Sequence, residues 1–143
     1  MNQRDLRPAR DFAVNFGGIY CIKNVINNKL YIGSAISIRN RTKNHRKLLT
    51  ANKHPNKHLQ AAWNNCAIDF EFYVIEIIND QSKLLEREQY WIDFYQSTVN
   101  TKGYNRRLKV NSNLGLKPSI ETRTKMSKAQ MGHRAQKKLL FTK

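Results

Sequence analysis

Residues 17–33 read GGIYCIKNVINNKLYIG, and this stretch decides the fold. It holds two short runs of β-branched and aromatic residues, GGIYCI and KLYIG, on either side of the polar pair Asn27-Asn28. Paired asparagines tolerate positive φ and suit the tight primed turns that join antiparallel strands. The stretch therefore predicts a β-hairpin that brings Tyr20 and Tyr31 close together on neighbouring strands, beside glycines that let another backbone or a ligand approach.

The composition of the whole chain indicates a polyanionic partner. The 143 residues carry a formal charge of +16 and the pI is near 10.2, an excess too large to be incidental. The length suits one compact domain followed by a tail. The chain has no apolar run of transmembrane length, and its N-terminus lacks the apolar region of a secretory signal. We therefore expect an intracellular protein with no membrane partner.

The chain has two cysteines, Cys21 and Cys66, each within an apolar pattern. Free cysteine is among the most frequently buried residue types, and disulfides are rare in reducing compartments. We expect two buried free thiols that are neither paired nor nucleophilic.

Helical and strand patterns follow the hairpin in alternation. The first helix runs from a cap at Ser37 or a neighbouring residue to about Leu49, and a second covers residues 56–66. Residues 70–78, FEFYVIEII, alternate as a third strand, and residues 81–95 return to helical spacing. The prediction is a small α/β fold, a three-stranded and mainly antiparallel sheet flanked by helices.

Several polar residues on these helices are candidates for chemistry. Arg41 and His45 are four residues apart, so they share one face of the first helix. Glu88 lies on an otherwise apolar face of the third helix, beside Trp91 and Ile92. From the pattern alone it is either a metal-binding carboxylate or one more solvated helix charge.

The charge divides the chain into three predicted parts: a polar leader at 1–16, a compact domain at 17–105 and a basic tail at 106–143. The tail has 11 Lys and Arg residues against the single acid Glu121, a net +10, whereas the first 105 residues carry +6. A basic segment with little apolar surface gains more by lying along phosphates than by packing on a core. The residues expected to bind phosphates are Arg106, Arg107, Lys109, Lys117, Arg123, Lys125 and Lys128.

An ordered set of motifs across residues 17–105 resembles the GIY-YIG nuclease family. The set comprises GGIYCIKN, KLYIGSA, Arg41, His45, His54, LQAAW, EREQYWI and GYN, in family order and spacing. Within the family the likeness is greatest to intron-encoded homing endonucleases of phages and organelles, which also have a serine after the second motif, here Ser34. The tail segment LGLKPSIETRTKMSKAQMGH is similar to one copy of a DNA-binding repeat found behind many such nucleases.

The resemblance implies a metal-dependent endonuclease that acts on double-stranded DNA, in a phage or bacterial cytoplasm or in an organelle. The oligomeric state is left open by the sequence, with a monomer as one option. Glu88 falls on the family's metal-binding glutamate, for Mg²⁺ or another divalent cation such as Mn²⁺. Arg41 falls on the arginine that would neutralise charge developing on the phosphate. Tyr20 is expected to act as base or as water-orienting group, with Tyr31 in support. Both roles are kept open because a free phenol, with a pKa of about 10, is a poor base unaided.

His45 completes the expected catalytic residues, and four further residues support the site. His45 could hydrogen-bond the scissile phosphate or assist as an acid, and His54 matches a polar position of the homing branch. Asn105, in GYN, matches a family asparagine near the site, with turn formation beside Gly103 as the alternative. Gly18 and Gly33, one in each motif, would let backbone or ligand approach.

Other functions explain parts of the sequence. A repair or structure-specific nicking nuclease would share the site. A DNA-binding protein with a degenerate or truncated nuclease fits the shortness of the tail, and a basic RNA-binding protein fits the charge but not the motifs. Zinc at His54, His58 and Cys66 is disfavoured, because Pro55 interrupts the helix between the histidines and no second cysteine pair exists.

Overall fold

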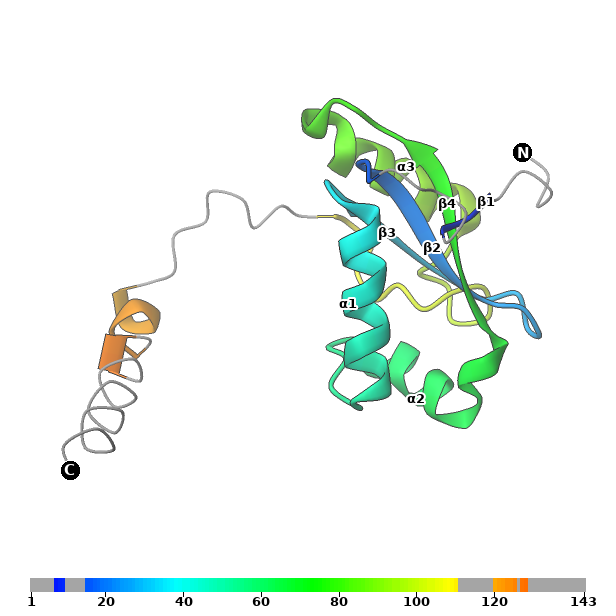
Figure 1. Ribbon diagram of the computed structural model, residues 1–143, viewed down its shortest axis with the longest axis horizontal. Helices are drawn as coiled ribbons and strands as arrows, with labels where there is room; N and C mark the ends of the chain where they lie inside the picture. Colours follow the sequence, from blue (N-terminus) through cyan, green and yellow to red (C-terminus); the bar gives the residue numbers. More distant parts are fainter. Residues whose placement is uncertain (1–6, 10–14, 111–119, 126, 129–143) are drawn as a thin grey trace. The chain divides into compact units, whose positions relative to one another are not determined.

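The computed structural model describes residues 7–9, 15–110, 120–125 and 127–128. The chain divides into two units, Met1–Asn111 and Ser112–Lys143. In chain order the elements of the first unit are β1 (Arg7–Pro8), β2 (Gly18–Asn24), β3 (Leu30–Ala35), α1 (Ile38–Thr50), α2 (Lys57–Asn65), the 3-10 turn η3 (Ala67–Asp69), β4 (Phe70–Ile77), the 3-10 turn η4 (Gln81–Lys83) and α3 (Leu84–Tyr95) (Figure 1).

The sheet has the strand order β1-β4-β2-β3, and every pair is antiparallel. The predicted α/β class and the three main strands are confirmed. The register of the hairpin places Tyr20 opposite Gly33 and Ile22 opposite Tyr31, so both tyrosines point to the same face. The two-residue β1 is a fourth strand within the segment predicted as a leader. It escapes sequence reasoning because two residues carry no alternation, and its Pro8 is tolerated at a sheet edge.

The turn of the hairpin differs from the tight two-residue turn that Asn27-Asn28 predicts. The backbone N–H of Asn24 donates to the carbonyl of Lys29 (3.0 Å), which closes a longer loop. The Asn24 side-chain oxygen accepts from the backbone N–H groups of Ile26 (3.0 Å) and Asn27 (3.2 Å). Only Asn28 of this loop has a positive φ, 60°. An asparagine side chain at the strand end therefore replaces the second positive-φ residue of a primed turn.

Side chains cap the starts of the first two helices, and Ser37 is among the predicted caps. The Ser37 hydroxyl accepts from the Asn40 N–H at the start of α1, and the Asn56 side chain accepts from the Leu59 N–H at the start of α2. The third helix begins as the turn η4, capped by Asp80, before it becomes α3. In the described part of the chain, no helix combines the length and the apolar character needed to cross a membrane.

Helices cover both faces of the sheet, α1 and α2 on one and α3 on the other (Figure 1). The α1 face buries Tyr20, Ile22, Ile38, Leu49, Leu59, Phe70, Phe72, Val74 and Tyr104. The α3 face buries Ile19, Cys21, Leu30, Ile32, Ile75, Ile78, Leu84, Trp91 and Ile92. The expectation of two buried thiols is correct for Cys21 and wrong for Cys66, which is exposed because it caps the C-terminus of α2 and contributes nothing to its buried stripe.

A β-bulge at Ile75 interrupts the register of β4 with β2 and the predicted alternation of this strand. Immediately after it, the Glu76 carboxylate faces α3. It accepts from Arg87 Nε at 2.9 and 3.1 Å and from Trp91 Nε1 at 2.7 Å. These bonds fix α3 against the sheet and so orient Glu88, the residue that follows Arg87.

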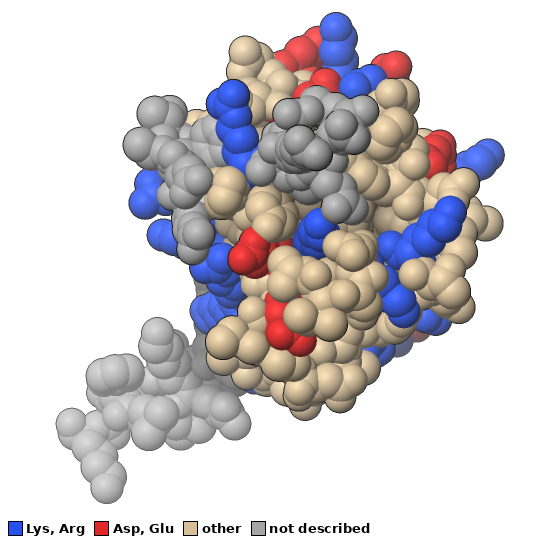
Figure 2. Space-filling view, turned by 90° about the vertical axis from the view of Figure 1, so that its right-hand side faces the viewer, with Lys and Arg blue, Asp and Glu red and all other residues tan. Residues whose placement is uncertain are grey.

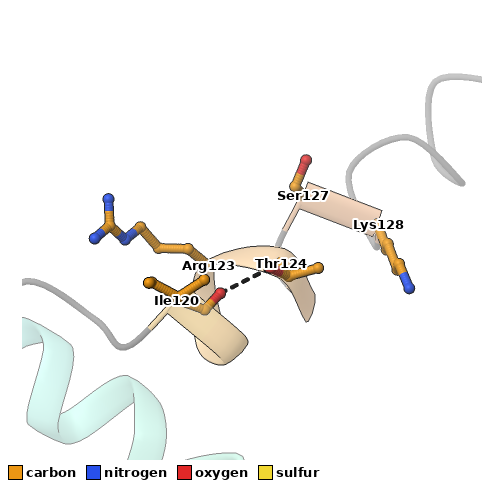
Figure 3. A pocket seen from close by; sticks show the side chains of 5 residues that line it. All are labelled: Ile120, Arg123, Thr124, Ser127 and Lys128. Carbon is orange, nitrogen blue, oxygen red and sulfur yellow. Dashed lines mark hydrogen bonds between the residues drawn. The ribbon is translucent and has the colours of Figure 1, made fainter.

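The second unit is helical over residues 120–125 and 127–128. The Thr124 hydroxyl donates to the carbonyl of Ile120 (2.8 Å) within a shallow pocket of this helix (Figure 3). Lys125 pairs with Glu121 one turn away (3.0 Å). Lys117, predicted to bind phosphate, lies outside the described residues.

Candidate active site

The two strands of the hairpin give Tyr20 its position. Tyr20 points to the α1 face and is 1% exposed. Its ring lies over Gly33, where an added Cβ would stand 2.4 Å from the phenol oxygen. Glycine at this position therefore makes room for the tyrosine ring itself.

Tyr20 ends a chain of hydrogen bonds that runs through two histidines. Its hydroxyl lies 2.6 Å from His45 Nε2, and His45 Nδ1 lies 2.7 Å from His54 Nε2. The backbone N–H of Asn56 donates to His54 Nδ1 (3.1 Å). Neutral His54 must then carry its proton on Nε2 and donate to His45, which in turn donates from Nε2 to the phenol oxygen. Arg41 Nε gives that oxygen a second donor at 3.3 Å.

Both histidines are held neutral. Burial lowers the pKa of His45 to about 3, with further lowering by the charge of Arg41 and by His54. Burial also lowers the pKa of His54. With two donors on its oxygen, Tyr20 has its own hydroxyl hydrogen left to point elsewhere. His45 is 3% exposed and uses both ring nitrogens inside the protein, which places it behind Tyr20.

The guanidinium of Arg41 interacts with both phenols, those of Tyr20 and Tyr31. Burial raises the pKa of Tyr20, and Tyr31 raises it further, whereas Arg41 lowers it. Burial likewise raises the pKa of Tyr31, opposed by the charge and hydrogen bond of Arg41. The Tyr31 ring also meets the His45 ring edge-on at 5.5 Å between centroids. In the free protein both phenols are protonated at neutral pH, so they act as hydrogen-bond donors and not as bases.

Glu88 reaches the site from α3, on the other side of the sheet. Its carboxylate accepts from the Ser34 hydroxyl at 2.5 Å. Burial raises the pKa of Glu88, opposed by the Ser34 hydrogen bond and the charge of Arg41. Successive residues of a strand point to opposite faces. Gly33 therefore receives the Tyr20 ring on one face while Ser34 holds Glu88 on the other.

Asn105 clamps the strand that joins these two halves. Its side chain accepts from the backbone N–H of Ile32 (2.8 Å) and donates to the carbonyl of the same residue (2.9 Å). The backbone N–H of Tyr104 donates to the carbonyl of Leu30 (2.8 Å). Because β3 is an edge strand, these bonds satisfy polar groups that would otherwise lack a partner.

Sequence reasoning missed the structural roles of three polar residues that hold the site together: Ser34, Asn56 and Gln60. Gln60 is buried on α2, where its side chain accepts from the His54 N–H (2.9 Å) and donates to the Leu49 carbonyl (2.9 Å). The signal for Gln60 is a glutamine next to an apolar stripe, in LQAAW. Asn56 was foreseeable as a helix cap but not as the residue that sets the His54 tautomer.

The structure brings together six of the predicted site residues: Tyr20, Tyr31, Arg41, His45, His54 and Glu88. Gly18 lies apart from them, since its φ is +156° and an added Cβ would stand 2.0 Å from the Glu76 carbonyl oxygen. Position 18 requires a glycine because β2 packs closely on β4 there. The basic residues Arg106, Arg107 and Lys109 are exposed beyond the clamp at Asn105.

Positive charge is concentrated on α1. The sequence of this helix has five Lys and Arg residues and no acid, and all Asp and Glu residues of 15–110 lie between 69 and 93. The face shown in Figure 2 carries acidic as well as basic side chains. The helix that supplies Arg41 is therefore a surface suited to phosphate.

Glu88 is the candidate ligand for a metal ion. Among the described residues, no group of three or more His, Cys, Asp and Glu side chains is arranged to hold a metal. Mg²⁺ does not need such a cage, because it keeps several waters and is held by one or two carboxylates together with substrate phosphate. A half-buried carboxylate anchored by Ser34 fits that requirement, and the same chemistry suits Mn²⁺.

Comparison with known proteins shows the family to which the chain belongs. Residues 16–105 match the family model described as the GIY-YIG catalytic domain. The chain is 40% identical over 89 residues to Intron-associated endonuclease 1 of Enterobacteria phage T4, covering 62% of this chain and 36% of that protein. It is 32% identical over 130 residues to Probable intron-encoded endonuclease 1 of Neurospora crassa, covering 87% of this chain and 41% of that protein.

Solved structures of related catalytic domains have the same fold as this chain. The chain superposes on the catalytic domain of the intron endonuclease I-TevI, in a glutamate-to-alanine variant, with a TM-score of 0.62 and 35% identity, covering 69% of this chain and all of that one. A second structure, of the catalytic domain of the homing endonuclease I-TevI, superposes with a TM-score of 0.60 and 38% identity, and the match covers 64% of this chain and 98% of that one. The chain spans about two fifths of the length of the full-length relatives it matches.

Proposed function

The chain belongs to the GIY-YIG family, and on this premise we propose that it is a metal-dependent endonuclease of a mobile intron that hydrolyses phosphodiester bonds in double-stranded DNA. The observation that carries the proposal is the convergence of Tyr20, Arg41 and Glu88 at β3. Full-length relatives named as intron endonucleases share 32–40% identity with it. Nuclease activity accounts for the ordered site better than a binding role, which would leave the buried histidine chain unused.

Arg41 would bind the scissile phosphate. Its guanidinium is permanently charged and planar, so it matches the non-bridging oxygens on which negative charge accumulates during hydrolysis. Its bonds to the phenols hold it in one orientation before substrate arrives. Preorganised charge of this kind requires little rearrangement during the reaction.

Tyr20 would orient the attacking water. The donors from His45 and Arg41 occupy the lone pairs of its oxygen and direct its hydroxyl hydrogen away from them. The same two donors would stabilise a phenolate if a bound cation lowered the pKa of Tyr20 far enough for it to accept a proton. Tyr31 would support Arg41 from the neighbouring strand.

Glu88 would hold the divalent cation, Mg²⁺ or Mn²⁺, with Ser34 fixing one carboxylate oxygen. Family nucleases generally depend on a divalent metal. When bound, such an ion would supply Lewis acidity at the phosphate and the leaving oxygen. Glu88 must be ionised for this role, and the Ser34 hydrogen bond and the Arg41 charge both favour the ionised form.

The basic residues after Asn105 would add affinity for DNA without sequence selection. Arg106, Arg107 and Lys109 are exposed, as are Arg123, Lys125 and Lys128 in the second unit. We propose that residues 106–143 act as a DNA-binding tail containing one copy of the nuclease-associated repeat, with residues 17–105 as the nuclease domain. Contacts of this type release counterions, so binding should weaken steeply as salt rises.

The test is incubation of supercoiled plasmid with the full chain and Mg²⁺, for the wild type, Glu88→Ala and Glu86→Ala. The wild type should nick or linearise the plasmid, and Glu88→Ala should lose cleavage while its affinity for a duplex oligonucleotide stays unchanged. Glu86→Ala is the matched control, since Glu86 is exposed on the same helix, and it should cleave normally. Equal loss of cleavage and affinity in Glu88→Ala would remove the metal-ligand assignment, and an inactive wild type would favour a binding protein.

A further inference from the structure

The chain does not leave the nuclease fold at Asn105. Residues 106–110 run from the edge of β3 to α3 and belong to the first unit, which ends at Asn111. We call residues 105–110 the strap. Its first anchor is the Asn105 side chain, which pairs with both backbone groups of Ile32 on β3. Its second anchor is the side chain of Gln89 on α3. The strap is therefore attached at both ends to elements that carry the site.

Gln89 binds the strap through both ends of its carboxamide. Its Oε1 accepts from the backbone N–H of Val110 (2.8 Å), and its Nε2 donates to the carbonyl of Leu108 (3.0 Å). The same Nε2 donates to the Asp93 carboxylate (2.9 Å), which fixes the end of the amide that faces each backbone group. Residues 106–109 are exposed, so apolar packing does not hold this part of the chain. The attachment to α3 therefore depends on Gln89 and on the packing of Val110 against the α3-face core.

The strap holds Arg107 between the two halves of the site. One anchor is at the strand neighbour of Tyr31, and the other is at the helix neighbour of Glu88. Arg107 is exposed, and its guanidinium has no hydrogen-bond or ion-pair partner within the described residues. Burial raises the pKa of Tyr31, and the charges that lower it are those of Arg41 and, to a smaller extent, Arg107. Arg107 is thus a second cation beside the phenols, free to bind an anion.

A cation in this place suits a second phosphate of the substrate. A DNA strand carries one phosphate charge per about 3.4 Å of helix axis, so other phosphates must lie close to the one bound by Arg41. An arginine that is already held in place loses less freedom on binding than one on a free segment. We propose that Gln89 is a positioning residue of the nuclease, which anchors the strap and so keeps Arg107 at a phosphate near the scissile one. The inference rests on the proposed nuclease function and adds that Arg107 acts from a fixed place in the first unit.

The test uses the absence of charge on Gln89. The affinity of the full chain for a duplex oligonucleotide is measured without Mg²⁺ between about 50 and 200 mM salt, and single-turnover cleavage of supercoiled plasmid is measured with Mg²⁺. Arg107→Ala should lower the slope of log affinity against log salt by about 0.9, the value for one lost phosphate contact. Gln89→Ala removes no charge, yet it should lower the slope in the same direction and slow cleavage. The double variant should bind and cleave no worse than Arg107→Ala alone, because the same contact cannot be lost twice.

The matched control is Gln81→Ala, which removes an exposed glutamine from the turn η4, outside the strap and its anchors. It should leave the slope and the cleavage rate unchanged. A wild-type slope in Gln89→Ala would overturn the positioning role, and so would a wild-type slope in Arg107→Ala. Losses in rate that add in the double variant would also overturn it, because they would assign the effect of Gln89 to its neighbour Glu88. These three outcomes leave the proposed function standing, whereas absence of cleavage by the wild type would overturn that function and the positioning role with it.

Discussion

Gly33→Ala tests whether the phenol of Tyr20 must stand where β3 places it. The new Cβ would lie 2.4 Å from the Tyr20 oxygen and 2.6 Å from the ring carbon that bears it, whereas ordinary contact begins at 3.4 Å. The ring must therefore move by about 1 Å, and a displacement of that size can cost about 100-fold in rate. The backbone is not the cause, because Gly33 is not among the residues with a positive φ.

The displacement breaks specific contacts. The bonds of the Tyr20 oxygen to His45 (2.6 Å) and to Arg41 (3.3 Å) would lengthen together. Overpacking a buried site destabilises a protein by about 1–3 kcal/mol, so the variant should still fold. We expect the single-turnover rate of cleavage to fall about 100-fold, equal to about 2.7 kcal/mol of transition-state stabilisation, with a modest drop in melting temperature.

A double-mutant cycle with Tyr20→Phe separates this explanation from general damage. If Gly33→Ala acts through the Tyr20 hydroxyl, the double variant should cleave about as slowly as Tyr20→Phe alone, because the same interaction cannot be lost twice. Additive losses in rate would refute the reasoning. So would a Gly33→Ala protein that cleaves at nearly the wild-type rate.

Four further expectations concern pH, stability and salt. Ser34→Ala should move the acidic limb of the pH–rate profile to higher pH, because it removes a donor that lowers the pKa of Glu88; an unmoved limb would contradict this. His45, with its pKa lowered to about 3, should stay neutral from pH 8 to 5 by NMR, and the free energy of unfolding should fall as pH drops through about 6.5, because only the unfolded chain takes up the proton. Asn105→Ala should destabilise the fold by about 1–3 kcal/mol in thermal melts, since it leaves two backbone groups of β3 unpaired. Removal of the residues after Lys109 should weaken DNA binding and flatten its salt dependence, and an unchanged slope would exclude the tail as the main contact.

Much of the fold could be predicted because local signals agreed with tertiary packing. The hairpin, the caps at Ser37 and Asn56 and the strand at residues 70–78 all follow from short patterns. The failures have local causes as well. A two-residue strand carries no period, and the Asn24 side chain organises the hairpin loop from outside the predicted turn. The exposure of Cys66 depends on where α2 ends, and sequence patterns place helix ends only within a residue or two.

Much less of the site could be predicted from residue types alone. The resemblance supplied Glu88 and Arg41, and spacing supplied the shared face of Arg41 and His45. Neither could show that His45 lies buried behind Tyr20, since that depends on how α1 packs on β2. The tautomer of His54 depends on one backbone N–H at Asn56, and backbone donors leave no trace in a sequence.

The geometry of β3 explains how a small number of polar groups can build the candidate site. Gly33 and Ser34 are neighbours, yet they serve opposite faces of the sheet, one receiving the Tyr20 ring and the other holding Glu88. A slip of one residue in the register of β3 would exchange these faces and separate the phenol from the carboxylate. An edge strand has a partner on one side only, so its register is the least restrained in the sheet. The side chain of Asn105 pairs with both backbone groups of Ile32 on the open side. We therefore propose that Asn105 acts on the site through the register of β3, without contact with the reacting groups.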